Sequence, residues 1–446
     1  MQRYIICLKS LVLLLAYSAL HAAVPGPVSE GARTVEMYDK YELKFNLDSD
    51  SKINPFRTDP LPMLLTKPGG AKWSTPGGAD VWAQITTPGG RSVKVYGFWD
   101  TDYLYLGRSA KYGGVQHSRF IPVSAPHWKV RYAPQELGRH RVVIYARDAG
   151  GTSSSQEFAF TCVPGAGEGF VKLSADRTRL VYSSGKPYIA FMGKALERED
   201  FAASGINTVR TWITNSRNTE AFREVEPEHW ILDGAALDTQ VARSGERSVR
   251  KTGRGGFLTM EKVPVRSGSY YKASAWIKTD ACFTGSAAVQ VKVWYSDGRS
   301  ETLTGSPVGP GSCWVQSVLN FSTADAPGGA AELIDFKISI LSGEGTVWVD
   351  DAALFECNAD YSTKVNANYL WQPDFEEWNP SKLRLSAMWR LEERLTEYRK
   401  MGITQQLCIF DYKLWDPNPK GWYSRFFGDT WWQAGSKSGA QQNMAL

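Results

Sequence analysis

Phe201-Ala-Ala-Ser-Gly205-Ile-Asn-Thr-Val-Arg210-Thr-Trp212-Ile213 and Tyr398-Arg-Lys-Met-Gly402-Ile-Thr-Gln-Gln-Leu407-Cys-Ile-Phe410 are two stretches with one pattern. In each, a helical run ends at a glycine, an isoleucine follows, and an apolar strand begins. Glycine is favoured just after the last turn of a helix. A continuous apolar strand is typical of a parallel sheet that is covered on both faces. The two stretches therefore predict the helix–strand repeat of a TIM-type barrel, of which three strands can be placed.

The sequence between these stretches has a different pattern. From about residue 216 to 357, apolar and polar residues alternate, as in Tyr270-Tyr-Lys-Ala-Ser-Ala-Trp-Ile-Lys278 and Val289-Gln-Val-Lys-Val-Trp-Tyr295, and tight glycine turns separate the runs. This alternation predicts antiparallel strands, and we expect an inserted jelly-roll β-sandwich. A helical pattern resumes at about Ser381, so the insertion follows a strand and precedes its helix. In a barrel such a loop lies at the catalytic rim.

The whole chain is predicted to be a multidomain, mostly β protein. Residues 30–164 alternate with period two and contain turn signals such as Pro88-Gly-Gly, which predicts a compact β-sandwich of immunoglobulin type. The expected order is a signal peptide (1–23), this sandwich (30–164), the first part of a barrel (165–215), the insertion (216–357) and a truncated continuation of the barrel (358–446).

The first 23 residues have the features of a secretory signal peptide. Arg3 and Lys9 accompany a short apolar run, Leu11-Val-Leu-Leu-Leu-Ala16, and small residues follow at Ala22-Ala23. This run is too short to cross a bilayer, and no later stretch is apolar enough for a membrane span. We expect a mature protein that is secreted, periplasmic or held at the cell surface.

Composition narrows the function classes. Removal of Arg3 and Lys9 with the signal lowers the formal charge from +5 to +3, which gives no indication of nucleic-acid binding. Aromatic residues make up 13% of the chain, with 17 Trp, and an exported, Trp-rich β protein is typical of sugar binding. The alternative is that these rings fill sandwich cores. Five cysteines remain after the signal, which fits neither a disulfide scaffold nor a zinc site. A bridge between two of them, Cys282 and Cys313, stays open, and the five are Cys162, Cys282, Cys313, Cys357 and Cys408.

Several motifs resemble known families. Val35-Glu-Met-Tyr-Asp-Lys-Tyr-Glu and Val95-Tyr-Gly-Phe-Trp99-Asp resemble the immunoglobulin-like sandwich of unknown function that precedes many bacterial glycosidase barrels. Gly245-Glu-Arg-Ser-Val-Arg-Lys-Thr-Gly253 and Gly345-Thr-Val-Trp-Val-Asp-Asp-Ala are similar to a CenC-type carbohydrate-binding module. Asn207-Thr-Val-Arg-Thr-Trp212 resembles the start of a clan-A glycoside hydrolase barrel.

The resemblance implies the carbohydrate-binding, N-terminal portion of a secreted polysaccharide-degrading glycoside hydrolase. In that family the acid/base Glu follows an Asn at the end of the fourth strand, and the nucleophile lies on the seventh. This chain contains no Asn-Glu dipeptide. No catalytic residue is therefore carried over, and we expect the chain to be inactive by itself. Two of the acids near the rim could form a catalytic pair, and these acids are Asp374, Glu376, Glu377 and Asp411. The favoured alternative is that the first three line a solvated loop and that Asp411 binds substrate or caps the next helix. The alternative function is a non-catalytic, exported carbohydrate-binding or adhesion protein.

Candidate binding residues fall into three groups, and the expected partner is a polysaccharide or an oligosaccharide. Substrate binding at the barrel mouth is predicted for Arg210, Trp212, Asp411 and Trp415. Stacking on sugar rings in the inserted module is predicted for Trp276, Trp294, Tyr295, Trp314 and Trp348, of which alternation lets only some face a ligand. Asp350 and Asp351 have the carboxylates that a structural calcium prefers, although a turn-capping role is the favoured alternative.

Overall fold

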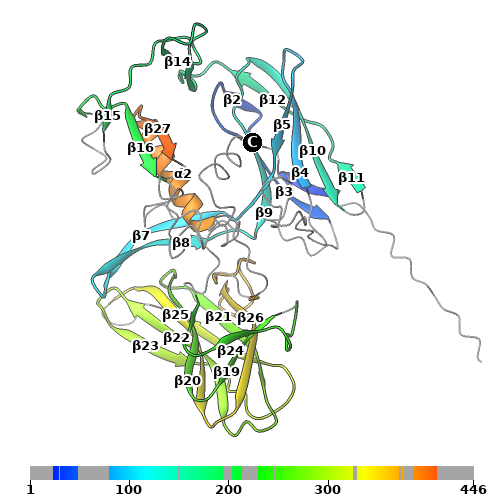
Figure 1. Ribbon diagram of the computed structural model, residues 1–446, viewed down its shortest axis with the longest axis vertical. Coiled ribbons are helices and arrows are strands. Elements are labelled where there is room, and N and C mark those ends of the chain that lie inside the picture. Colours follow the sequence, from blue (N-terminus) through cyan, green and yellow to red (C-terminus); the bar gives the residue numbers. More distant parts are fainter. Residues whose placement is uncertain are drawn as a thin grey trace, which may run out of the picture. The chain divides into compact units, whose positions relative to one another are not determined.

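The computed structural model of the protein (Figure 1) confirms a mostly β, multidomain chain. It describes residues 24–29, 31–48, 80–148, 151–193, 203–212, 230–245, 247–324, 329–370, 374–375 and 385–408. The predicted signal peptide and the substrate-binding candidates Asp411 and Trp415 lie outside these residues. In the described part, no helix is both long and apolar enough to cross a membrane. The chain divides into two compact units.

The first unit is a sandwich of two β-sheets. A buried pair of rings joins the sheets, since the ring centroids of Tyr41 and Phe160 lie 4.0 Å apart. One sheet has the order β1 (Val24–Ser29), β3 (Tyr41–Asp48), β9 (His127–Tyr132), β6 (Phe98–Asp100). The other has the order β2 (Thr34–Glu36), β12 (Phe158–Val163), β10 (Gly138–Asp148), β4 (Asp80–Thr86), β5 (Ser92–Tyr96), with β11 (Gly151–Ser154) paired to β10. The immunoglobulin-like topology of this sandwich stays a prediction.

A long hairpin leaves this sandwich between β6 and β9. Its strands β7 (Tyr103–Tyr112) and β8 (Val115–Pro122) pair with each other and turn at Gly113 and Gly114, whose positive φ angles of 60° and 83° suit glycine. Residues Trp99–His127 belong to the second compact unit. The sequence patterns had placed them within the first sandwich, because strand alternation carries no information about which core a hairpin joins.

The second unit contains a small parallel sheet. It has the order β15 (Met192–Gly193), β16 (Thr208–Trp212), β27 (Thr404–Cys408), and β16 and β27 lie in the two stretches whose pattern predicts the barrel strands. The antiparallel pair β13 (Val171–Leu173) and β14 (Leu180–Tyr182) precedes it. Helix α2 (Leu385–Lys400) leads into β27. A full barrel stays a prediction.

Gly402 ends α2 as the sequence predicts. Its φ is +73°, its N–H bonds to the carbonyl of Arg399, and the N–H of Ile403 bonds to the carbonyl of Tyr398. This is the Schellman arrangement, in which a left-handed glycine satisfies the last carbonyls of a helix. Ile403 and Tyr398 are then buried against Val209 of β16, which fixes the helix on the sheet.

The insertion between β16 and α2 is a β-sandwich, as predicted. Two five-stranded antiparallel sheets enclose one core, which Leu370 and Phe375 extend beyond the expected boundary at 357. One sheet has the order β17 (Ile231–Leu232), β20 (Gly255–Pro264), β25 (Ala331–Ser342), β22 (Ser286–Tyr295), β23 (Ser300–Thr304). The other has the order β18 (Ala236–Asp238), β19 (Ser248–Thr252), β26 (Thr346–Cys357), β21 (Tyr270–Thr279), β24 (Val315–Ser322).

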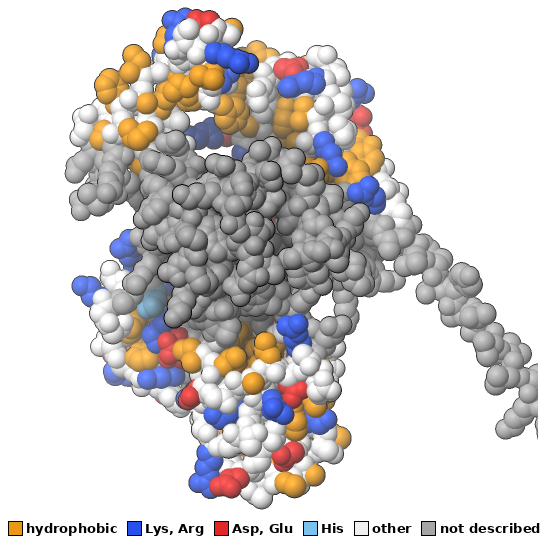
Figure 2. Space-filling view, in the orientation of Figure 1, with side chains coloured by type: hydrophobic (Ala, Val, Ile, Leu, Met, Phe, Trp, Pro, Cys, Tyr) orange, Lys and Arg blue, Asp and Glu red, His pale blue; other side chains and the backbone are white. Residues whose placement is uncertain are grey.

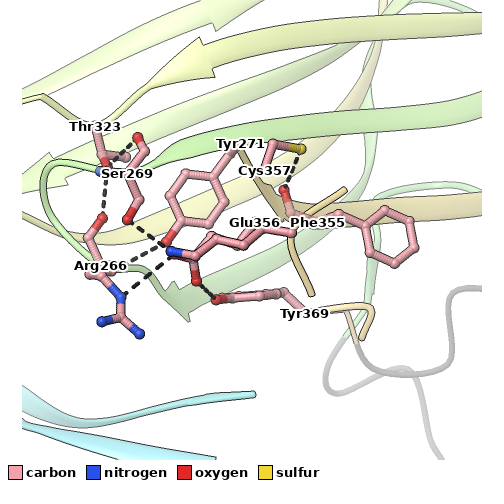
Figure 3. A network of polar contacts seen from close by, with 9 residues as sticks. Arg266, Ser269, Tyr271, Thr323, Phe355, Glu356, Cys357 and Tyr369 are labelled. Atoms are coloured by element: carbon pink, nitrogen blue, oxygen red, sulfur yellow. Dashed lines mark hydrogen bonds and ion pairs between the residues drawn. The ribbon is translucent and has the colours of Figure 1, made fainter. Parts of the chain in front are cut away.

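A buried carboxylate ties the end of β26 to neighbouring loops (Figure 3). Glu356 is 1% exposed and accepts hydrogen bonds from Lys364 Nζ at 2.9 Å and from the Tyr369 hydroxyl at 2.9 Å. The Ser269 hydroxyl donates to it at 3.2 Å, and Arg266 Nε lies 3.6 Å away. Burial by itself raises the pKa of Glu356, but these bonds and the two cationic side chains outweigh burial and leave the pKa below its usual value.

Candidate functional site

Two tryptophans lie on the outer face of the sheet that contains β26 and β21. Core residues of these strands, such as Ile277 and Val349, point inward, so their neighbours Trp276 and Trp348 point outward. Trp276 pairs with Asp350, and Lys278 pairs with Trp348. The two indoles are therefore diagonal neighbours on adjacent strands, within reach of one another. We call this outer surface the indole face.

Trp348 is held by a hydrogen bond that crosses a strand. Its Nε1–H donates to Asp238 Oδ2 at 3.0 Å. Asp238 lies on β18, two strands away from β26, with β19 in between. Because neighbouring strands are about 4.8 Å apart, the indole reaches this partner only by lying across β19. The half-buried ring is thus fixed along the sheet surface.

Backbone N–H groups of the turn that follows Asp238 hold its carboxylate in place as a hydrogen-bond acceptor. Its Oδ1 accepts the N–H groups of Gln240 at 2.7 Å and Val241 at 3.1 Å. Burial opposes ionisation of this carboxyl, but the hydrogen bonds, including that from Trp348, lower the pKa of Asp238 below its usual value. An ionised acceptor strengthens the bond that orients the indole.

Trp276 carries a guanidinium on its ring. The Arg243 guanidinium carbon lies 3.8 Å from the ring centroid, and Arg243 Nη1 also donates to Asp351 Oδ2. The N–H groups of Arg243 and Ser244 donate to Asp350 Oδ2 at 2.8 and 3.2 Å. The two neighbouring carboxylates therefore hold the turn that places Arg243 over Trp276. Burial raises the pKa of Asp350 to about 6, although these backbone bonds oppose the shift.

The predicted calcium ligands do not fit a calcium site. Asp350 accepts backbone N–H groups at both oxygens, including that of Asp351 at 2.8 Å. Asp351 accepts a guanidinium N–H and the Ser244 hydroxyl. A cation here would compete with the positive charge of Arg243 and with N–H donors that already use the oxygen lone pairs. Among the described residues, no group of three or more Asp, Glu, His or Cys is arranged to hold a metal ion.

The other aromatic candidates lie elsewhere in the module. Trp314 is half-buried and directly precedes β24, whose Val315 pairs with Ile277, so it lies near the indole face. Trp294 belongs to the opposite sheet. Tyr295 is 5% exposed and forms part of the core. The predicted set therefore divides between two faces and the core.

Trp294 is enclosed by other side chains. Its Nε1–H donates to Asp335 Oδ2 at 2.8 Å, and the Nζ atoms of Lys262 and Lys292 each lie 4.0 Å from its ring centroid. The ring of Tyr112, at the end of β7, lies 5.5 Å away. This tryptophan joins the hairpin to the sandwich.

A buried polar cluster fixes the hairpin on the sandwich, and nothing in the sequence pattern indicated it. The Tyr112 hydroxyl donates to Glu332 Oε2 at 2.8 Å and lies 2.9 Å from the carbonyl oxygen of Tyr295. The Ala110 N–H donates to the same carboxylate at 2.7 Å, and Arg119 Nη2 lies 3.8 Å from Glu332 Oε1. Burial, followed by the Glu332 carboxylate, raises the pKa of Tyr112, so the hydroxyl stays a donor.

The predicted barrel-mouth residues are placed only by their backbone. Arg210 and Trp212 lie on β16, where they pair with Gln406 and Cys408 of β27. Their side chains, together with Glu376 and Glu377, lie outside the described residues.

The two cysteines of the inserted sandwich for which the sequence left a bridge open, Cys282 and Cys313, are free, exposed thiols.

No protein-family profile matches the chain, and no curated protein sequence does. Among solved structures, a Bacteroides vulgatus protein that carries a provisional glycoside hydrolase assignment is similar over 88% of this chain, with 13% identity and a TM-score of 0.36. The chain spans 43% of the length of that protein. The xylan-binding domain CBM22-1 of Paenibacillus barcinonensis Xyn10C matches 30% of this chain and 90% of its own length, with 17% identity and a TM-score of 0.24.

A third similar structure is the CBM22-1–GH10 part of Clostridium thermocellum xylanase 10B in complex with xylohexaose. It covers 30% of this chain and 28% of its own length, with 18% identity and a TM-score of 0.23.

Proposed function

We propose that the inserted sandwich binds a polysaccharide or an oligosaccharide through the indole face. The observation that carries this proposal is Trp348, whose indole is held along the sheet surface by Asp238. Sugar rings have apolar C–H faces that stack on indoles, and hydroxyl groups that bond to nearby polar side chains. A fixed aromatic ring with polar neighbours supplies both at low entropic cost.

Polar neighbours are present at the second indole. Gln316 pairs with Trp276 across β24 and β21, and its amide donates to the Ser274 hydroxyl at 3.3 Å. Amide and hydroxyl groups next to an aromatic ring are the donors and acceptors that sugar hydroxyls use. Xylan binding by the similar CBM22 domains is a property of those proteins, and it makes xylan one of the glycans to test.

We further propose that this module belongs to the N-terminal portion of a secreted polysaccharide-degrading glycoside hydrolase. The arrangement β16–sandwich–α2–β27 supports this, since it places a binding module in a strand-to-helix connection of a parallel sheet. We expect the 446-residue chain to release no sugar from any glycan. The alternative, an exported binding or adhesion protein without a catalytic role, predicts the same result for this chain. The size of the native secreted protein separates them, because only the hydrolase proposal expects a species much heavier than 49.6 kDa.

Affinity electrophoresis of the whole chain tests the binding proposal. Gels containing xylan, β-glucan, mannan, galactan or pectin would be run with the unaltered protein and with Trp348→Ala and Trp276→Ala. We expect retardation by at least one glycan and at least a tenfold weaker dissociation constant for each variant, equivalent to about 1.4 kcal/mol.

Trp82→Ala is the matched control, because Trp82 lies in the first unit, stacked on Tyr145 at 5.4 Å. It should leave glycan binding unchanged. Binding that Trp82→Ala abolishes and Trp348→Ala preserves would place the site in the first unit and refute the proposal. Absence of retardation by every glycan would refute it as well.

A further inference from the structure

Basic side chains flank Trp348 on the indole face. Arg250 pairs with Trp348 across β19 and β26, and Lys278 pairs with Trp348 across β21 and β26. All three occupy outward positions of adjacent strands, at which Cβ atoms lie about 5 Å apart. Trp348 therefore has a cationic residue as its direct cross-strand neighbour on each side.

The second indole has a cation in contact with it, since the guanidinium of Arg243 lies 3.8 Å from the ring centroid of Trp276. Each indole of this face is thus associated with at least one basic side chain. On the opposite sheet, Trp294 also has lysines near its ring, but Asp335 bonds to Lys262 and the Tyr112 ring lies beside it.

Two acidic groups of the indole face, Asp238 and Asp350, lie below its surface. The Asp238 side chain is 7% exposed against 53% for Arg250, whose Nε lies 3.6 Å away. Asp350 is fully buried. The third, Asp351, has a side chain that is 25% exposed, and it is paired with Arg243, whose side chain is 34% exposed. Among the described residues, no ion pair joins Lys278 to an acid. The charges that meet solvent beside the indoles are therefore mainly positive.

We infer that the indole face prefers polysaccharides that carry anionic groups, either uronate carboxylates or sulfate esters. This inference rests on the proposed function of the same face. When a pyranose ring lies flat on an indole, its exocyclic substituents project from the ring edge. A carboxylate or sulfate there meets a charged side chain on either flank of Trp348. Guanidinium and ammonium groups form charge-assisted hydrogen bonds with both kinds of anion.

The test compares glycans that differ in charge. Polygalacturonate is paired with its fully methyl-esterified form, and a sulfated galactan with the same galactan after desulfation. Dissociation constants of the whole chain are measured at two salt concentrations. We expect at least tenfold tighter binding to one anionic glycan than to its neutral partner, and a loss of that preference at high salt. Preference for polygalacturonate identifies uronates as the ligand, and preference for the sulfated galactan identifies sulfate esters.

Variants assign the preference to the basic side chains around Trp348. Lys278→Gln and Arg250→Gln should each weaken binding to the anionic glycan at least threefold without changing binding to its neutral partner. Lys278→Arg, which keeps the positive charge, should bind the anionic glycan as the unaltered protein does. Lys337→Gln, on β25 of the opposite sheet, should have no effect. Thermal melting of each variant checks that it folds.

The results separate the inference from the proposed function. Equal binding to charged and neutral partners, weakened in both by Trp348→Ala, would overturn the anionic preference and leave glycan binding in place. A preference that Lys278→Gln and Arg250→Gln leave unchanged would also overturn it. Absence of binding to all four of these glycans, in a chain that xylan, β-glucan or mannan retards in a Trp348-dependent way, would overturn the anionic preference and leave glycan binding in place.

Discussion

The hairpin cluster gives the sharpest test of how this chain is assembled. Tyr112→Phe removes one hydroxyl and keeps the ring that packs on Trp294. Both Tyr112 and Glu332 are 7% exposed, and a hydrogen bond to a buried charged group contributes about 1.5–3 kcal/mol. Glu332 keeps the Ala110 N–H as a donor and Arg119 as a nearby cation, so we expect the lower part of this range, about 1.5–2 kcal/mol.

This loss should appear as easier local opening of the hairpin. A change of about 1.5–2 kcal/mol corresponds to roughly 10–30-fold faster amide exchange. Hydrogen exchange at the Ala110 N–H, which Glu332 accepts at 2.7 Å, measures it directly. Exchange in the parallel sheet, for example at Val209, should not change.

Tyr105→Phe is the matched control for this experiment. Tyr105 lies on the same strand with its ring stacked on Phe120 at 4.7 Å, and it is 38% exposed. Its substitution should leave Ala110 exchange within about twofold of the unaltered protein. The role of the Tyr112 hydroxyl is refuted if Tyr112→Phe also leaves that exchange within twofold, or if Tyr105→Phe accelerates it as strongly.

Three further predictions concern stability. Because burial raises the pKa of Asp350 from 3.8 to about 6, its contribution to the unfolding free energy should fall as pH rises from 4 to 7, and urea titrations of Asp350→Asn should lack this loss. The pKa of Glu356 lies below its usual 4.5, so its contribution should instead fall as pH drops below about 4.5; Glu356→Gln should lower stability by about 1–3 kcal/mol at pH 7 and show a weaker acid dependence. Gly402→Ala should cost about 1–2 kcal/mol, because φ is +73° there, whereas Gly402→Asn should cost less in thermal melts.

Local patterns predicted the elements wherever a single physical cause governs them. Glycine is the residue that takes a left-handed conformation without steric cost, so Gly402 marked the end of α2 and the start of β27. Alternation of apolar and polar residues likewise predicted the inserted sandwich. The common pattern of the two stretches predicted parallel strands, and β16 and β27 pair in parallel although partners such as Thr208 and Thr404 are 196 positions apart.

The candidate site was predicted only in part. The sequence singled out tryptophans in the inserted module, but Trp294 and Trp348 sit in equally alternating strands on opposite sheets. Strand periodicity states which residues share a face of their own strand; it does not state which sheet the strand joins. The orientation of Trp348 depends on Asp238, which lies 110 residues away in the chain.

By itself, the sequence determined the mostly β composition, the inserted sandwich and the glycine-capped helix–strand step, because these depend on short-range sterics and hydrophobic periodicity. Only the tertiary structure decided that the hairpin with Tyr112 packs on Glu332, that Asp350 and Asp351 hold a turn in an arrangement that does not fit calcium, and that Arg250 and Lys278 flank one indole. Those juxtapositions arise from pairing between distant strands and from burial of individual polar groups, for which a linear sequence contains no local signal.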